Sequence, residues 1–154
     1  MPSNTSSSPD NDDASAIQLS ITEQPIDYNA LTESVRSNLC GAVVLFLGTV
    51  REVTGDKKTS SLEYEAYEEM AFIELRRIIE TAMQKWPIEK VSITHRVGYL
   101  DLGEIAIGIA ISTPHRKEGF EAAQFLMSQI KETVPIWKKE NWADGSTDWV
   151  HPQK

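Results

Sequence analysis

The sequence is poor in cysteine and in long apolar runs. Its 154 residues include one cysteine, Cys40, which excludes an internal disulfide and any metal site built from several thiolates. No apolar run approaches the roughly 20 residues that a membrane-spanning helix needs, so we expect a soluble protein without a membrane partner. The N-terminus lacks a secretory apolar segment, which together with the single cysteine predicts a cytoplasmic location.

Positive charge and familiar catalytic motifs are also scarce. The net charge is -8, from 15 Lys+Arg and 23 Asp+Glu, and this balance argues against a nucleic-acid partner because such binding needs a basic face. The chain contains neither a P-loop nor a G-x-S-x-G nucleophile motif. Its three histidines, His95, His115 and His151, have no metal-ligand spacing with Cys40. We therefore expect no metal and no other cofactor.

Length and composition predict one domain behind a short tail. The chain is 40% hydrophobic and 25% charged, which is typical of globular proteins. Residues 1–16 are rich in Ser, Asn, Asp and Pro and predict a disordered tail, because they have few apolar side chains to bury. This tail is acidic and lacks arginine, which argues against an organellar transit peptide. Residues 17–154 show no linker or repeat and predict a single domain.

Hydrophobic periodicity predicts an α+β fold with a mainly antiparallel sheet and about three packed helices. Residues 41–51, GAVVLFLGTVR, form a near-continuous apolar run, which is typical of a central strand covered on both faces. Polar residues 52–60 indicate a mobile loop, and the segment after the last helix is expected to be extended. Alternating residues predict further strands at 17–21, 62–67, 91–97 and 105–111, the last two forming an antiparallel hairpin. Helical spacing predicts helices at 27–40, 68–86 and 120–134, the last with an apolar stripe of Phe120, Ala123, Met127, Ile130 and Val134.

The segment from Thr113 to Lys139 is the best candidate for binding an anion. It carries five Lys/Arg and three Glu, in a chain whose remainder is strongly acidic. His115 and Arg116 lie between a predicted strand and the following helix, where free backbone N–H groups and the helix dipole favour an anion such as phosphate. The alternative is that this pair only caps the helix and forms surface ion pairs.

Two lysines further along the chain are candidates for one pocket. Lys131 follows the last turn of the helix's apolar stripe, and Lys138 comes seven residues later, past the helix-ending Pro135. A lysine can neutralise a phosphate or a developing oxyanion, and it can transfer a proton when burial lowers its pKa. The alternative for each is an ordinary solvated lysine.

Other polar residues give weaker signals. Arg51 ends the 41–51 strand, where it could serve a site or pair with a surface carboxylate. His95 and Arg96 lie within an alternating strand, and we expect them to be structural or at an interface. Cys40 lies at the end of a predicted helix, where the dipole disfavours a thiolate, so we expect a buried small side chain.

Several blocks resemble the catalytic large subunit of molybdopterin synthase, the MoaE family. They follow the family's order over about residues 17–150, and the last block is the most specific. The blocks are GAVVLFLGTVR at 41–51, LEYEAYEEMA at 62–71, HRVGYLDLGE at 95–104, HR at 115–116 and KETVPIWKKE at 131–140.

The resemblance implies an α/β-hammerhead fold and a sulfurtransferase of molybdenum cofactor biosynthesis. Members of the family convert cyclic pyranopterin monophosphate, also called precursor Z, into molybdopterin by adding two dithiolene sulfurs. The sulfur comes from a thiocarboxylate on the C-terminal Gly-Gly of a small ubiquitin-like subunit, so the large subunit needs no persulfide cysteine. The assembly is a heterotetramer built on a dimer of large subunits.

The resemblance also implies roles for individual residues. Lys131 would act at the reacting centre by assisting proton transfer and stabilising the acyl intermediate, and Lys138 would balance substrate charge and could transfer a proton. Phe46 and Met127 would be apolar walls, although each could equally belong to the core. The positions expected to bind substrate are Thr49, Val50, Arg51, His115, Arg116, Lys139 and Glu140.

The sequence departs from the family pattern at both ends. The tail of 16 residues lies outside the similar blocks, and the C-terminal DGSTDWVHPQK has no arginine to lend to a neighbouring subunit's site, although Lys154 could substitute. Two other functions stay open at this point. One is a non-catalytic phosphate- or nucleotide-binding module that uses Arg51, His115 and Arg116. The other is an assembly scaffold that uses the Trp-rich C-terminal segment.

Overall fold

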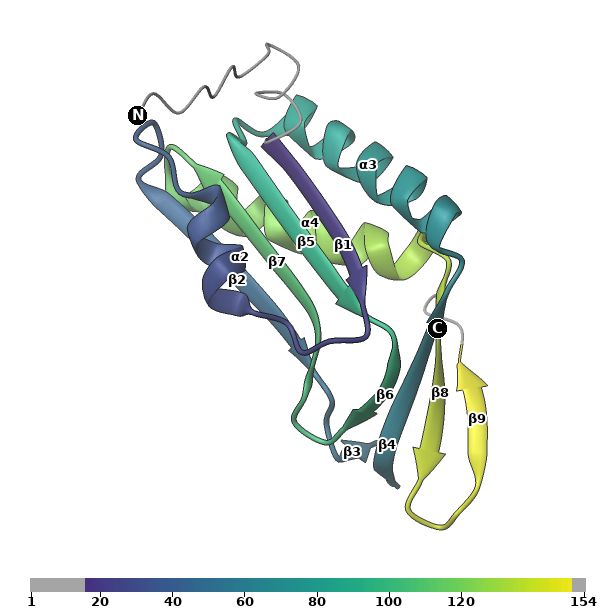
Figure 1. Cartoon of the computed structure of the whole chain (residues 1–154). Helices are drawn as coiled ribbons and strands as arrows, with labels where there is room; N and C mark the ends of the chain where they lie inside the picture. Colours follow the sequence, from purple (N-terminus) through teal and green to yellow (C-terminus); the bar gives the residue numbers. More distant parts are fainter. Residues whose placement is uncertain (1–15, 151–154) are drawn as a thin grey trace, which may run out of the picture.

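The computed structural model describes residues 16–150 (Figure 1). These residues contain three helices and nine strands, and the strands form two sheets. The helices are α2 (Tyr28–Val35), α3 (Glu68–Lys85) and α4 (Arg116–Thr133). The strands are β1 (Ile17–Thr22), β2 (Ala42–Thr49), β3 (Val53–Thr54), β4 (Lys57–Ala66), β5 (Lys90–Arg96), β6 (Gly98–Asp101), β7 (Ile105–Thr113), β8 (Ile136–Trp142) and β9 (Thr147–Val150). The predicted tail up to residue 15 lies outside the described residues, as do His151 and Lys154.

The first sheet has the strand order β1-β5-β7-β2 and is covered on both faces by helices. Only β1 pairs in parallel; the β5–β7 and β7–β2 pairs are antiparallel. On β7, Ile109 and Ile111 pack with α3 and α4, whereas the intervening Ala110 faces α2. Gly108 also faces α2, where an added Cβ would lie 2.7 Å from Leu31 Cδ2, so this glycine allows the close approach of the helix. The α+β prediction with three helices and a mainly antiparallel sheet is confirmed.

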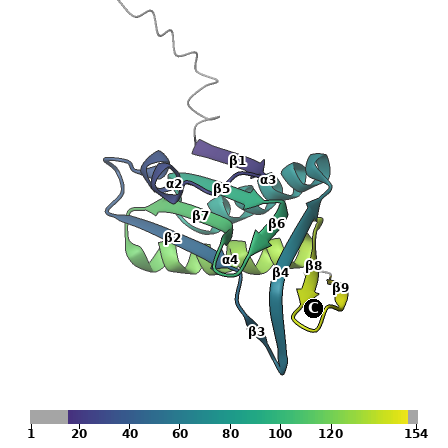
Figure 2. The ribbon, with the colours of Figure 1, turned by 60° about the horizontal axis from the view of Figure 1, so that its bottom comes forward.

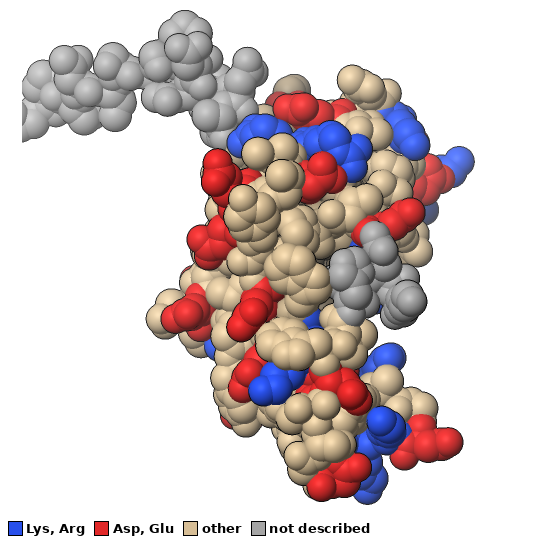
Figure 3. Space-filling model, turned by 90° about the vertical axis from the view of Figure 1, so that its right-hand side faces the viewer, with Lys and Arg blue, Asp and Glu red and all other residues tan. Residues whose placement is uncertain are grey.

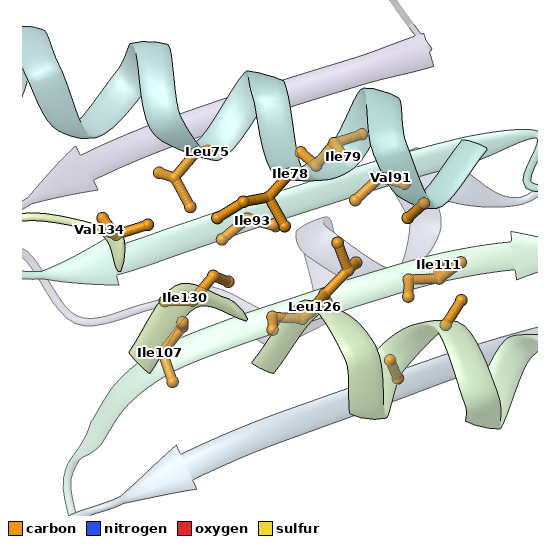
Figure 4. Packing of buried hydrophobic residues seen from close by; sticks show 14 of the residues in the cluster. Leu75, Ile78, Ile79, Val91, Ile93, Ile107, Ile111, Leu126, Ile130 and Val134 are labelled. Atoms are coloured by element: carbon orange, nitrogen blue, oxygen red, sulfur yellow. The ribbon is translucent and has the colours of Figure 1, made fainter. Parts of the chain in front are cut away.

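The core lies between the sheet and the pair α3 and α4 (Figure 4). The helix predicted at 68–86 is confirmed as α3, which buries Ala71, Leu75, Ile78, Ile79 and Ala82, whereas Trp86, just beyond its end, is only partly buried. In α4 the predicted stripe is partly wrong. Phe120 is 63% exposed, whereas Leu126 is fully buried, so the helix turns a neighbouring stripe of residues toward the core.

The second sheet is wholly antiparallel, with the order β3-β4-β8-β9 and with β6 also paired to β4. It projects from the end of the first sheet, beside the C-terminal end of α4 (Figure 2). Strand β4 begins at Lys57 and forms a hairpin with β3 through Gly55, whose φ is +61°. The predicted loop at 52–60 is therefore largely sheet, and the predicted loop between β5 and β7 contains β6.

The strand predicted to be central is an edge strand. β2 pairs only with β7 in the described part of the chain, and two of its apolar side chains, Val43 and Phe46, remain 38% exposed. The first helix is also shorter than predicted, because α2 ends at Val35. Cys40 consequently lies in the connection to β2 and is only partly buried, rather than at a helix end. None of the helices within residues 16–150 is long and apolar enough to cross a membrane.

Candidate active site

A cavity of about 990 Å³ lies where β2, the C-terminal half of α4 and the second sheet meet. It combines apolar and polar walls. The apolar part includes Phe46 on β2 and Met127 on α4, and the polar part is supplied by several different elements. The polar residues that line it include Thr49, Arg51, Tyr64, His95, Ser128, Lys131, Lys138 and Glu140.

Lys131 supplies an uncommitted positive charge to this cavity. It lies in the last turn of α4, where the helix dipole favours a cation. Its side chain is exposed, and none of the ion pairs among the described residues includes it. Arg51, just beyond β2, is likewise exposed and lines the same cavity. Both cations are therefore available to an anionic ligand.

Lys138, in contrast, is held by a buried carboxylate. Its Nζ lies 3.2 Å from Glu140 Oε1, and Thr59 Oγ1 donates a hydrogen bond of 3.0 Å to Glu140 Oε2. Glu140 is only 3% exposed, so both of its oxygens have partners within the protein. This arrangement positions the Lys138 ammonium at the cavity wall, opposite Tyr64 in the register of β4 and β8.

Tyr64 and His95 also line the cavity, although neither was predicted to be a site residue. Their rings meet edge to face, with centroids 5.0 Å apart and planes at 70°. Burial lowers the pKa of His95 from 6.5 to about 4, so the ring is neutral at pH 7. Burial, with a smaller effect of Glu140, raises the pKa of Tyr64 to about 12. The sequence feature that could have indicated His95 is its spacing. It alternates with Val91 and Ile93, which places a histidine on the buried face of the strand.

The low pKa of His95 predicts loss of stability in mild acid. Between about pH 6.5 and pH 4 the unfolded chain binds a proton that the folded ring does not, so stability falls as pH decreases through this window. The total loss of stability is about 3 kcal/mol.

Urea unfolding between about pH 7.5 and pH 4 should show this loss in the wild type and a smaller loss in His95→Gln. The matched control is His115→Gln, which removes an exposed histidine and should keep the wild-type loss. Identical pH dependence in wild type and His95→Gln would contradict the assignment.

Four predicted site residues lie outside the cavity. Val50 is in a separate apolar cluster, and its backbone is engaged within the fold: its N–H donates to Glu104 and its C=O accepts from Gly103. Its N–H is therefore not free to bind a substrate, and the residue does not line the cavity. Lys139 follows Lys138 on β8 and so points to the opposite face, where its Nζ lies 3.9 Å from Glu63.

His115 and Arg116 are the other two, and they lie at the N-terminal end of α4. Lys131 comes fifteen positions after Arg116, which places their Cα atoms about 22 Å apart along the helix. His115 occupies the N-cap position without a capping side-chain hydrogen bond, and Arg116 forms no ion pair with the described residues. The alternative role of this pair, capping the helix and forming surface ion pairs, is thus not seen among the described residues. Within one chain, however, His115 and Arg116 also lie far from Lys131 and Lys138.

Neither Arg96 nor Cys40 belongs to the cavity. Arg96 is structural, as predicted: its guanidinium lies 3.2 Å from Glu104 and donates to the Glu23 carbonyl. Burial raises the pKa of Cys40, which disfavours the thiolate, and this residue does not line the cavity. On the face shown in Figure 3, acidic and basic side chains are interspersed without a broad basic patch.

Comparisons with known proteins agree in pointing to one family. Residues 21–133 match the family model described as MoaE protein. The chain is 45% identical over 136 residues to the molybdopterin synthase catalytic subunit of Halalkalibacterium halodurans, covering 88% of this chain and 86% of the relative. It is 47% identical over 133 residues to that of Bacillus subtilis, covering 86% and 84%.

Solved structures give the same result. The crystal structure of molybdopterin synthase from Staphylococcus aureus matches with a TM-score of 0.80 and 44% identity, over 84% of this chain and 94% of that chain. The molybdopterin biosynthesis MoaE protein from Burkholderia ambifaria matches with a TM-score of 0.76 and 32% identity, over 90% and 91%. A chain from a complex of subunits 1 and 2 of molybdopterin-converting factor from Helicobacter pylori shares the fold, with a TM-score of 0.66, 18% identity and coverage of 88% and 89%.

Proposed function

This chain belongs to the MoaE protein family, and from that membership we propose that it is the catalytic subunit of a molybdopterin synthase, acting in molybdenum cofactor biosynthesis. The reaction is a sulfur transfer that converts cyclic pyranopterin monophosphate into molybdopterin in the cytoplasm. The sulfur donor is a small ubiquitin-like subunit with a C-terminal Gly-Gly thiocarboxylate. The structural observation that best supports this proposal is the cavity lined by both Lys138, which Glu140 positions, and Lys131, which forms no ion pair among residues 16–150.

The cavity suits both anions of this reaction. Arg51 and Lys131 form no ion pair among the described residues, so they can attract a phosphate and a thiocarboxylate. Phe46 and Met127 offer apolar walls for the flat part of the substrate. Thr49 supplies a hydroxyl at the same rim.

Each transfer proceeds through a thioester. The thiocarboxylate sulfur forms a bond to a substrate carbon, and the C–O bond of that carbon breaks, its oxygen leaving as water after protonation or staying on the phosphate as a phosphate oxygen. Water then adds to the acyl carbon, the bond between this carbon and sulfur breaks, and the small subunit departs with an ordinary carboxylate. Lys131 stabilises the oxyanion that forms on the acyl carbon, and Lys138, held by Glu140, balances substrate charge and assists proton transfer. Two such transfers complete one molybdopterin.

A dimer accounts for His115 and Arg116. These residues lie too far from Lys131 of the same chain to contact one small substrate, but a second subunit could bring its own pair to the cavity. One edge of β2 has no strand partner within residues 16–150, and with Val43 and Phe46 partly exposed this strand is suited to contact such a subunit. In this proposal the pair binds the substrate phosphate across the interface, within a heterotetramer that has two small subunits.

A non-catalytic phosphate-binding module is less well supported. A dimer could bring Arg51, His115 and Arg116 into one site for such a module too, but a binding module gives no role to Lys131 or to the Lys138–Glu140 pair in the cavity. An assembly scaffold would not need the pairing of Lys138 with a buried carboxylate inside a cavity.

Reconstitution tests the proposed function. The purified protein, cyclic pyranopterin monophosphate and the thiocarboxylated small subunit should together produce molybdopterin. The same mixture with the small subunit as its ordinary carboxylate is the control and should produce none. Absence of product with the thiocarboxylate, or equal product with both forms, would contradict the proposal.

A further inference from the structure

His95 presents a hydrogen-bond acceptor to the cavity. Its Nδ1 lies 2.6 Å from the carbonyl oxygen of Arg96, and because a carbonyl only accepts, Nδ1 carries the ring proton. With one proton on the neutral ring, Nε2 is left with a free lone pair. No hydrogen bond among residues 16–150 engages Nε2, although the side chain is only 7% exposed and lines the cavity.

The ring is also fixed in orientation. The hydrogen bond to Arg96 holds one edge against the backbone of β5, and the ring of Tyr64 packs against it at 70°. The opposite edge of the imidazole, which contains Nε2, is therefore the part directed away from the strand. A fixed, neutral acceptor can recognise an N–H or O–H donor, and it cannot donate in return.

Nε2 of neutral His95 can only accept, whereas the hydroxyls of Thr49, Ser128 and Tyr64 can both donate and accept. The charged groups of the cavity differ from His95 more strongly. Arg51, Lys131 and Lys138 only donate, and both oxygens of Glu140 already have partners. Glu132 has an interaction of its own. The cations suit the anionic parts of a ligand, whereas His95 suits a neutral heterocycle that carries N–H groups.

We propose that Nε2 of His95 accepts a hydrogen bond from an N–H group of the substrate's pterin ring and thereby sets the orientation of that ring in the cavity. This inference rests on the proposed function, which supplies a pterin as the substrate. A pterin offers a lactam N–H and an amino group as donors. His95 is then a specificity-determining residue of the transfer reaction, separate from the lysines that act on the sulfur and the phosphate.

Two matched substitutions of His95 separate recognition from packing. Both remove the imidazole ring and its contact with Tyr64. His95→Gln can place an amide oxygen near the position of Nε2, whereas His95→Asn is too short and keeps only a group near Nδ1. In the reconstituted complex we expect His95→Asn to raise KM for cyclic pyranopterin monophosphate about tenfold with kcat changed less than about threefold. His95→Gln should restore KM to within about threefold of wild type. An equal rise in KM for both variants, or no rise in either, would overturn the proposal.

A second measurement uses the unaltered protein and does not depend on how the variants fold. The complex with 15N-labelled histidine, whose large subunit has three histidines, is followed by NMR as cyclic pyranopterin monophosphate is added. The signals of His95 are identified by their loss in His95→Gln or, if that variant does not fold, by their coupling to the neighbouring backbone. The Nε2 signal should have the position of an unprotonated nitrogen and shift on binding, while Nδ1 remains protonated. A protonated Nε2, or an unshifted signal at saturation, would refute the inference.

The failure of this inference can be told apart from the failure of the proposed function. If the wild-type complex makes molybdopterin but the expected KM and NMR results are not obtained, only the role of His95 is lost. If the wild-type complex makes no molybdopterin, the proposed function itself fails.

Discussion

Replacing Lys131 with alanine is expected to lower molybdopterin formation by at least about 100-fold while leaving the fold intact. The side chain is exposed and belongs to no ion pair within the described residues, so its loss removes little stability. Its loss does remove the cation proposed to stabilise the oxyanion of the acyl intermediate. The measurement is the single-turnover rate of product formation, together with the thermal unfolding midpoint of the variant.

Lys139→Ala is the matched control for this substitution. It removes the same charge close to the cavity, but from the side chain that points to Glu63 on the other face of β8. We expect a rate within about threefold of wild type, because the Lys139 side chain does not line the cavity in which the reaction takes place. Comparable losses in Lys131→Ala and Lys139→Ala would show that general charge, rather than the position of Lys131, is what matters.

A mixture of two impaired variants is expected to recover activity if the site is shared between subunits. Arg116→Ala should be at least about tenfold less active alone, since it removes a charge-assisted contact to the phosphate. When Arg116→Ala and Lys131→Ala chains form mixed dimers, one of the two cavities has an intact Lys131 from one chain and an intact Arg116 from the other. Random pairing then restores about a quarter of the wild-type sites.

The recovery should be measured in dimers that carry two different affinity tags. Dimers purified through both tags contain one chain of each variant and should reach about half of the wild-type rate. No recovery in these mixed dimers would contradict a shared site and would leave His115 and Arg116 without a role in the cavity.

The spacing of apolar residues correctly predicted the helices and strands whose buried face can be recognised from their own sequence. The stripe from Ala71 to Ala82 indicated α3 because it fits one face of a helix, and the alternating isoleucines from Ile105 to Ile111 indicated β7 in the same way. The position of β2 could not be predicted this way. Its apolar run looked like a central strand, but whether a strand is central or at an edge depends on partners that are distant in the chain.

Some features of the site could likewise be predicted from local sequence, whereas others depend on contacts between distant segments. Lys131 and Lys138 could be predicted to share a cavity because a short segment joins them across the end of α4. Lys139 could have been excluded from the sequence, since adjacent strand residues point to opposite faces. His95 could not be assigned, because its contact with Tyr64 arises only when β5 meets the second sheet. The separation of Arg116 from Lys131 follows from the length of α4, and a partner subunit is not visible in a single sequence.

The fate of the small subunit's sulfur tests the central claim most directly. In the reconstituted reaction, the thiocarboxylate carries a heavy sulfur isotope and the large subunit carries the substitution Cys40→Ser, so the chain has no thiol of its own. The proposed reaction predicts molybdopterin in which both dithiolene sulfurs are labelled, formed at about the wild-type rate because Cys40 does not line the cavity. Unlabelled sulfur in the product, or loss of the reaction with Cys40→Ser, would contradict transfer from the partner's thiocarboxylate.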